Sequence, residues 1–128
     1  MTQIVLSAFN RTRGTALCLR LDLASGLRDR SRGLIGRPAL ARDLGLLFER
    51  GRCEPFMWFH TMLMTFPIDI VFLDSDGTVL AVNHDLGPWR VSSLVLRARK
   101  AIELPSGRVR ETGTQTGDII VFEPPRSA

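Results

Sequence analysis

The 128-residue chain has 45% hydrophobic and 23% charged residues, values close to those of soluble globular proteins, and its length suits one domain. This composition excludes a fibrous or disordered protein. No apolar run approaches the roughly 18 residues of a membrane span, and the first ten residues lack the basic start of a signal peptide. We therefore expect a cytoplasmic protein with no membrane partner.

Charge and cysteine content narrow the class further. The net charge is +4, and ten of the 17 basic residues lie before residue 53, which gives the N-terminal part a basic surface. Cys18 and Cys53 are far apart and have no metal-ligand spacing, so both are predicted to be free thiols. The chain carries no oligomerisation heptad, which leaves a monomer or a small homo-oligomer open.

The first predicted elements are a strand and a helix. Residues 16–23 alternate strictly, with leucine at every odd position, which predicts a strand with one leucine face. Ser25 can cap a helix over residues 26–36, which Gly36 and Pro38 would end. This main helix would carry several arginines, among them Arg32 and, just after its end, Arg37.

Further along the chain, the clearest local signal is a hairpin. Residues 68–74 and 78–82 are apolar strands joined by Ser75-Asp76-Gly77, in which Asp-Gly supplies the positive φ angles of a tight turn. The other expected elements are strands at 45–48, 56–59, 98–104 and 119–123, a loop at 83–88 and one helical turn after Gly107.

These elements predict a mostly β protein of the α+β class. Short strands with one main helix and short helical turns favour a single compact domain built on a curled sheet or partial β-barrel. We assign residues 15–123 to this domain, residues 1–14 to an N-terminal segment and residues 124–128 to a C-terminal tail.

Several motifs, in order, resemble one known family. They are Arg32-Gly33-Leu34-Ile35-Gly36-Arg37, the segment from His60 to Asp74, Pro88-Trp89-Arg90, Glu103-Leu104-Pro105-Ser106-Gly107 and Gly117-Asp118. Together they span about residues 15 to 123 and resemble the family named domain of unknown function 192. The resemblance implies a compact β-rich domain found in bacteria and archaea. It implies no substrate, cofactor or partner, because none is established for the family.

Three titratable residues are candidates for a site. His60 follows two aromatic residues and could titrate near neutrality or bind a ligand, or it could be a hydrogen-bonded structural histidine. Asp69 lies in an apolar strand, so its carboxylate needs partners: either backbone groups and Thr61, or a functional pairing with His60 or an arginine. Glu103, between Ile102 and Leu104, poses the same question unless it faces solvent.

Other motifs give little chemistry. Trp89-Arg90 could stack on a ligand or bind an anion at the mouth of a pocket, or Trp89 could cap the core. No nucleophile elbow, phosphate loop, zinc-protease or dinucleotide motif is present, and no metal or cofactor is expected. Whether the protein catalyses any reaction is left open, and Cys53 with His60 shows no sign of an activated thiolate.

Two functional hypotheses remain. The preferred one is a small-molecule binding domain for an anionic or planar ligand, whose cleft gathers His60, Asp69, Trp89, Arg90, Glu103, Arg32 and Arg37. The alternative is a weak, electrostatic nucleic-acid binding module, because residues 105–119 also resemble the looped-hinge helix of small transcription regulators.

Overall fold

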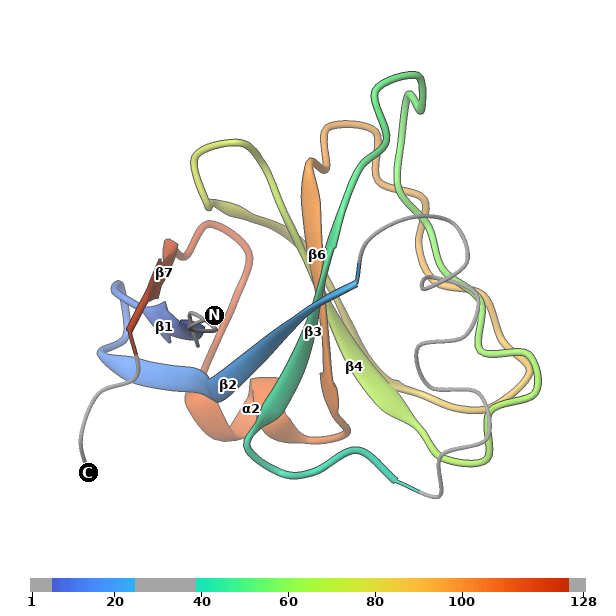
Figure 1. Ribbon diagram of the computed structural model, residues 1–128, viewed down its shortest axis with the longest axis horizontal. Helices are drawn as coiled ribbons and strands as arrows, with labels where there is room; N and C mark the ends of the chain where they lie inside the picture. Colours follow the sequence, from blue (N-terminus) through green and yellow to red (C-terminus); the bar gives the residue numbers. More distant parts are fainter. Residues whose placement is uncertain (1–5, 25–38, 125–128) are drawn as a thin grey trace, which may run out of the picture.

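The computed structural model describes residues 6–24 and 39–124. Figure 1 shows the elements, which are β1 (Leu6–Asn10), β2 (Thr15–Ala24), β3 (Leu44–Glu49), β4 (Ile68–Leu73), β5 (Val79–Leu86), β6 (Lys100–Pro105), the short helix α2 (Arg108–Thr112) and β7 (Ile120–Glu123). The predicted main helix at 26–36 lies outside the described residues.

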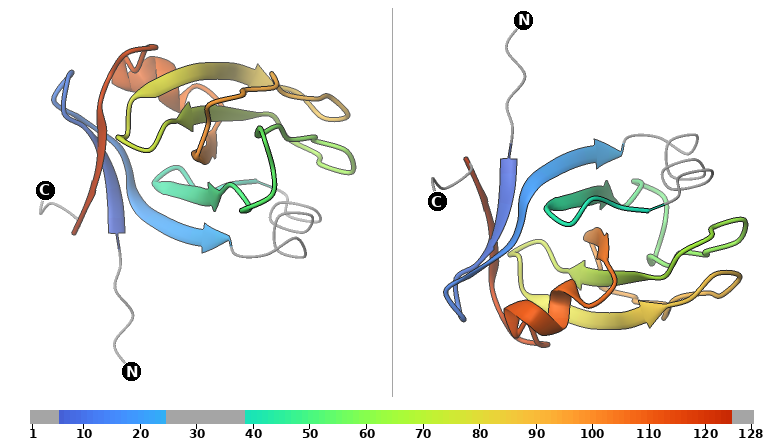
Figure 2. Two further views of the ribbon diagram at one scale, coloured as in Figure 1. Left: turned by 90° about the horizontal axis from the view of Figure 1, so that it is seen from above. Right: turned by 90° about the horizontal axis from the view of Figure 1, so that it is seen from below.

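One curled sheet contains all seven strands, in the order β5-β4-β6-β3-β2-β1-β7. The β2–β3 pair is parallel and the other pairs are antiparallel. The sheet curves until its two edge strands meet at one end, where the N–H of Val79 donates to the Asp118 carbonyl at 2.8 Å and the N–H of Ile120 donates to the Gly77 carbonyl at 2.8 Å. Figure 2 shows β2 and the β4–β5 hairpin on opposite sides of the curl. The predicted mostly β fold with a curled sheet is confirmed.

The predicted hairpin is confirmed and is longer than expected. Asp74 shapes its turn, because the Asp74 side chain accepts hydrogen bonds from the N–H groups of Asp76 and Thr78, each at 2.9 Å. Gly77 has φ 85°, and a Cβ there would lie 2.4 Å from the Ile120 carbonyl oxygen, so the closing of the sheet requires glycine. Beyond the turn, β5 continues through residues 83–86, where we expected a loop.

The predicted leucine face of β2 is only partly right. Leu17 and Leu21 are buried, but Leu19 and Leu23 are 45% and 66% exposed. The N–H groups of Leu19 and Arg20 both donate to the Asp43 carbonyl at 3.0 Å, which is the pattern of a β-bulge. The bulge shifts the alternation, so Leu17 and its neighbour Cys18 are both buried.

Two further differences concern the edges of the sheet. Leu6–Asn10, within the expected N-terminal segment, forms the strand β1 between β2 and β7. The expected strand at 56–59 is instead one half of a separate two-stranded ribbon, held by bridges from Met57 to Val95 and from His60 to Val91. We call residues 55–67 and 87–99 the ribbon. Figures 1 and 2 show these two segments running side by side beyond the sheet.

Each face of the sheet carries its own apolar cluster. The inner cluster fills the curl and draws residues from all seven strands and α2: Ala8, Leu17, Cys18, Leu21, Leu47, Val71, Leu73, Val79, Ile102, Leu104, Val109 and Ile120, with Val82 and others packed against it. The outer cluster lies between the other face of β3, β6 and β4 and the ribbon: Leu40, Leu44, Leu46, Phe48, Met57, Phe59, Met64, Ile68, Ile70, Phe72, Ala98 and Ala101. The strands β4 and β6 are therefore covered on both faces.

Within residues 6–24 and 39–124, the structure contains no helix long and apolar enough to cross a membrane.

Candidate functional site

Asp69 belongs to the inner face and is fully buried. One carboxylate oxygen accepts the N–H of Asp85 at 2.8 Å, and the other accepts the N–H groups of Gly107 and Val109 at 3.1 and 3.0 Å. Gly107 is the N-cap of α2 and offers no side chain, so Asp69 satisfies the orphan donors at this helix end in its place. Of the two alternatives for Asp69, the structure shows backbone partners and no contact with His60.

The residues around Asp69 support its structural role. Asp85 has φ 51° and its side chain accepts a hydrogen bond from the Ser106 hydroxyl. The end of β5 is thereby joined to the start of α2 through both the backbone and the side chain of Asp85. Asp69 therefore ties the start of β4 to the end of β5 and the start of α2, and both of its carboxylate oxygens already accept hydrogen bonds.

Glu103 lies on the outer face and has a different environment. It is 6% exposed, and its register partners are Leu46 on β3 and Ile70 on β4, both members of the outer cluster. Within the described residues, no group donates a hydrogen bond to its carboxyl and no cation pairs with it, and because no fully buried side-chain oxygen there lacks a partner, the Glu103 oxygens keep a small contact with solvent. Burial raises the pKa of Glu103 to about 8, so the carboxyl is protonated at neutral pH.

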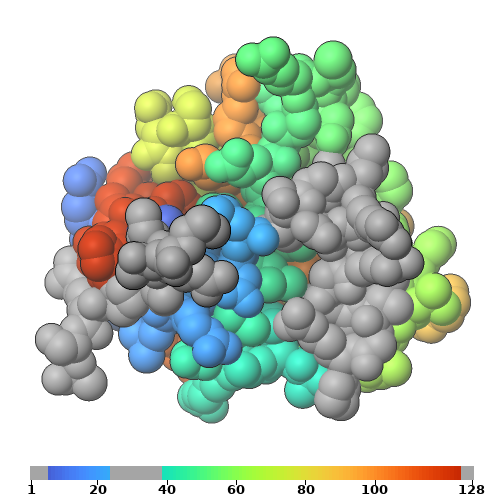
Figure 3. Space-filling view, viewed as in Figure 1, coloured from blue at the N-terminus to red at the C-terminus, as the bar shows by residue number. Residues whose placement is uncertain are grey.

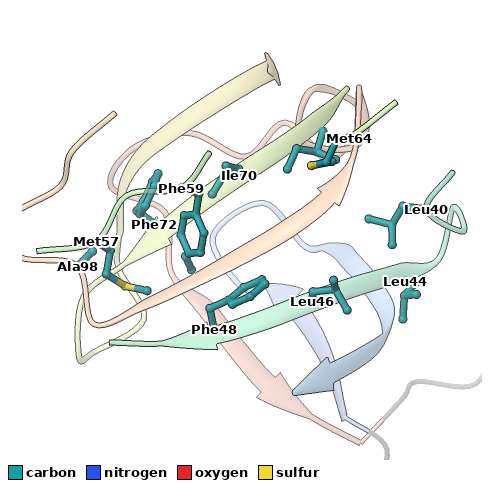
Figure 4. Packing of buried hydrophobic residues seen from close by; sticks show 12 residues of the cluster. Leu40, Leu44, Leu46, Phe48, Met57, Phe59, Met64, Ile70, Phe72 and Ala98 are labelled. Carbon is teal, nitrogen blue, oxygen red and sulfur yellow. The ribbon is translucent and has the colours of Figure 1, made fainter. Parts of the chain in front are cut away.

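The outer cluster has an aromatic half and an aliphatic half, as Figure 4 shows. In one half, the ring of Phe59 packs against Phe48 and Phe72 with centroid distances of 5.0 and 5.9 Å. In the other half, aliphatic side chains flank β6 on both sides, with Leu40, Leu44 and Leu46 toward β3 and Met64 and Ile70 toward β4. The Glu103 carboxyl therefore lies among aliphatic side chains, which cannot form strong hydrogen bonds with it.

The two buried carboxyl groups do not share a cleft. Asp69 is opposite Leu104, and Ile70 is opposite Glu103, in the β4–β6 register. Because successive side chains alternate between faces, Asp69 points inward with Leu104 while Glu103 points outward with Ile70. The sheet lies between them, and the single cleft expected from the sequence is not present in this form.

His60, Trp89 and Arg90 are brought together on the ribbon by Thr61. The buried Thr61 side chain donates to the Gly87 carbonyl at 2.6 Å and accepts the Arg90 N–H at 2.8 Å. Its backbone N–H donates to the Arg90 carbonyl and its carbonyl accepts the Trp89 N–H. The sequence predicted Thr61 only as a partner of Asp69. Its position before a turn, in an otherwise apolar segment, was the available signal.

The ribbon residues themselves face solvent. Trp89 is 62% exposed, and His60 and Arg90 are also exposed. The His60 Nδ1 atom accepts the Met62 N–H at 3.3 Å, and the ring lies 6.4 Å from the Trp58 ring, centroid to centroid. His60, Trp89 and Arg90 therefore form an open surface and not the wall of an enclosed pocket. Arg32 and Arg37 lie outside the described residues.

Sequence reasoning missed a polar network between the end of β1 and the segment that precedes β7. The buried Asn10 amide donates to Thr114 and to Asp118 at 2.9 and 3.0 Å, and Arg13 donates to Asp118 at 3.0 Å. Burial opposes ionisation of Asp118, but hydrogen bonds from Arg13, Asn10 and the Gln115 N–H bring its pKa below the usual value. The Asp118 carboxylate thus accepts from Asn10, Arg13 and the Gln115 N–H, and the network fastens β1 to the start of β7.

The His, Cys, Asp and Glu side chains of the described residues can also be checked for metal-ligand clusters and reactive thiols. No group of three or more His, Cys, Asp or Glu residues that could hold a metal ion occurs in the part of the chain that the structure describes. Cys18 is buried and Cys53 is exposed, and each is a free thiol. Burial raises the pKa of Cys18 to about 11, which keeps this thiol protonated and unreactive at neutral pH.

Comparisons with known proteins support the fold and leave the site open. Residues 8–122 match the model of the DUF192 family, described as "Uncharacterized ACR". No curated protein matches the chain. A solved structure from Sinorhizobium meliloti 1021, described as a "putative transcription regulator", is 24% identical with a TM-score of 0.77, and the match covers 92% of each chain. A protein of unknown function from Novosphingobium aromaticivorans DSM 12444 is 19% identical with a TM-score of 0.78, over 91% of this chain and 83% of that chain. At these identities the two structures share the fold alone.

Proposed function

The chain belongs to the DUF192 family, and because that family has no established activity, we propose from its geometry that it is a cytoplasmic small-molecule binding domain. The ligand contacts the aliphatic half of the outer cluster and meets the carboxyl of Glu103. A single observation carries the proposal: Glu103 is nearly buried among apolar side chains and has no hydrogen-bond partner among the described residues.

A nearly buried carboxyl that has no partner within the protein is costly to the fold, even where its oxygens keep a small contact with solvent. Buried polar groups almost always have a hydrogen-bond partner, and each one left without a partner costs about 1–3 kcal/mol. Asp69, on the neighbouring strand, shows how this chain satisfies a carboxylate that serves the fold. A polar group among apolar walls is also the usual composition of a ligand site, where it fixes the orientation of the bound molecule.

The chemistry around Glu103 favours a planar, largely apolar ligand. A protonated carboxyl can donate one hydrogen bond and accept another, so it suits a ligand with a carbonyl, amide or ring nitrogen. An anionic ligand would be repelled once Glu103 ionises. Its support in the sequence was Arg90 together with Arg32 or Arg37. Arg90 lies on the exposed ribbon, and Arg32 and Arg37 lie outside the described residues. Of the two expected ligand types, the planar one fits the described geometry better.

The alternative, weak nucleic-acid binding, loses one of its supports. In the segment that resembles a looped-hinge helix, the Arg108 guanidinium donates to the carbonyls of Leu17 and Ala16 and to the Glu111 carboxylate. This arginine is therefore engaged within the fold. Binding through the remaining arginines would be electrostatic and would weaken steeply with salt.

Native mass spectrometry of freshly purified protein tests the proposal. We expect an additional mass on the wild type that is lost in Glu103→Leu, because leucine removes the hydrogen-bonding group and keeps the site apolar. Glu49→Leu is the matched control, since Glu49 is exposed at the end of β3, and it should keep the additional mass. The planar fluorophore 1-anilinonaphthalene should bind the apo wild type and the control more tightly than it binds Glu103→Leu. A wild type that carries no added mass and binds the fluorophore no better than Glu103→Leu would contradict the proposal.

A further inference from the structure

The ribbon concentrates the exposed apolar surface of the described protein. Nine large hydrophobic side chains are exposed in residues 6–24 and 39–124, and seven of them belong to the ribbon. They are Trp58, Met62, Leu63, Trp89, Val91, Leu94 and Leu96. Figure 3 shows parts of both ribbon segments at the right-hand margin of the molecular surface. Scattered exposed hydrophobic residues are ordinary, but a contiguous group on one element indicates an interaction surface.

The backbone holds two of these side chains at unusual angles. Leu63 and Trp89 have φ values of 66° and 60°, a left-handed conformation that bulky residues rarely adopt. Thr61 fixes both neighbourhoods, since its carbonyl accepts the N–H of Trp89 and that of Met64, which closes the turn containing Leu63. Such strain costs on the order of 1–3 kcal/mol per residue and persists mainly at functional sites. The tip of the ribbon therefore presents Leu63 and Trp89 outward at a cost to the fold.

The charge of the ribbon is of one sign. Its two segments contain no aspartate or glutamate, whereas Arg90, Arg97 and Arg99 are all exposed. A second copy of the chain docked on this face would bring these arginines together. Nucleic acid suits the arginines and the tryptophans but gains little from exposed aliphatic side chains such as Leu63, Leu94 and Leu96.

We propose that the ribbon binds the surface of an anionic lipid bilayer, with Trp58, Trp89 and the aliphatic side chains in the headgroup boundary and the arginines on lipid phosphates. Tryptophan prefers this boundary, and apolar burial combined with cationic attraction is how proteins lie on membranes without crossing them. The expectation of no membrane partner came from the absence of a spanning run, which says nothing about surface contact. This proposal does not depend on the ligand site at Glu103.

Intrinsic fluorescence gives a selective test, because both tryptophans of the chain, Trp58 and Trp89, lie on the ribbon. We expect their emission to shift to shorter wavelength on addition of phosphatidylcholine–phosphatidylglycerol vesicles, and the protein to sediment with them. Pure phosphatidylcholine vesicles should give neither effect. Added salt should weaken the binding, because it screens the attraction between arginines and lipid phosphates.

Matched variants separate the ribbon from the rest of the surface. Leu63→Asn should weaken binding to the anionic vesicles about tenfold, since it removes one buried leucine and asparagine tolerates the positive φ. Arg90→Gln should weaken it about fivefold, the worth of one arginine near an anionic surface. Leu23→Asn is the control, because Leu23 is 66% exposed on β2, away from the ribbon, and it should bind like the wild type.

Four results would overturn the proposal. The first is no binding to the anionic vesicles, and the second is equal binding to neutral and anionic vesicles. The third is an equal loss of binding in Leu63→Asn and Leu23→Asn. The fourth is a tryptophan emission shift that appears with a single-stranded oligonucleotide, or with self-association at high protein concentration, and not with vesicles.

Discussion

Asp69 and Glu103 lie on neighbouring strands and are both buried in apolar surroundings, but they differ in their hydrogen-bond partners. On the inner face, Asp69 accepts three backbone N–H groups and joins β4 to the end of β5 and the start of α2. On the outer face, Glu103 has no partner among the described residues, and burial raises its pKa to about 8. Burial of a charged residue therefore does not by itself identify a site. What distinguishes the two residues is the supply of hydrogen-bond donors around each carboxyl.

The largest effect is expected from Asp69→Ala, which leaves three buried N–H groups without an acceptor. The free energy of unfolding should fall by at least about 3 kcal/mol, and the melting temperature by roughly 10 °C or more. Thermal unfolding followed by circular dichroism measures this. Asp69→Asn, which keeps one acceptor oxygen, should lose less than Asp69→Ala. A loss below about 1 kcal/mol in Asp69→Ala would remove the contrast between the two faces.

The next effect concerns pH. The pKa of Glu103 is raised from 4.5 to about 8, so between these values the folded protein holds a proton that the unfolded chain has released. The contribution of Glu103 to stability is therefore complete below pH 4.5 and is lost as the pH rises toward 8, by at most about 1.4 kcal/mol per pH unit. Urea unfolding of wild type and Glu103→Gln from pH 5 to 9 measures this, and the difference between the two should carry the slope. Parallel curves would show that Glu103 is ionised in the folded protein.

A smaller effect of opposite sign is expected from Glu103→Leu. Leucine has a similar size and needs no hydrogen bond, so at pH 8 the variant should be more stable than the wild type by about 1–2 kcal/mol. The control Glu49→Leu, at an exposed position, should change stability by less than about 0.5 kcal/mol. Destabilisation by Glu103→Leu would mean that the carboxyl supports the fold, as Asp69 does.

The smallest effect is expected at His60, which lies on the ribbon and on neither face of the sheet. Because its ring is exposed and, among the described residues, accepts one long hydrogen bond, His60→Ala should lower the melting temperature by less than about 3 °C. The same thermal melts used for Asp69 measure this shift. A drop of about 8 °C or more would make His60 a structural residue.

Local patterns explain which parts of the fold could be predicted. The β4–β5 hairpin followed from its apolar strands and the Asp-Gly turn, and both are short-range signals. The leucine face of β2 was only half right, because the bulge at Leu19 and Arg20 depends on a carbonyl from Asp43, some twenty residues away. The alternation of residues along one strand cannot reveal a hydrogen-bond acceptor that only strand pairing brings near.

The candidate site likewise depends partly on local sequence signals and partly on tertiary pairing. The alternation of residues along the chain was enough to predict a mostly β domain, to identify Asp69 and Glu103 as carboxyl groups that need partners, and to assign each to one face of its own strand. That these two faces lie on opposite sides of the sheet follows from strand pairing, through the register that places Asp69 opposite Leu104. The tertiary structure also determines that the N–H groups of Asp85, Gly107 and Val109 converge on Asp69 and that none reaches Glu103. The physical reason is that a strand fixes only the direction of its own side chains, whereas hydrogen-bond partners come from segments that pairing brings near.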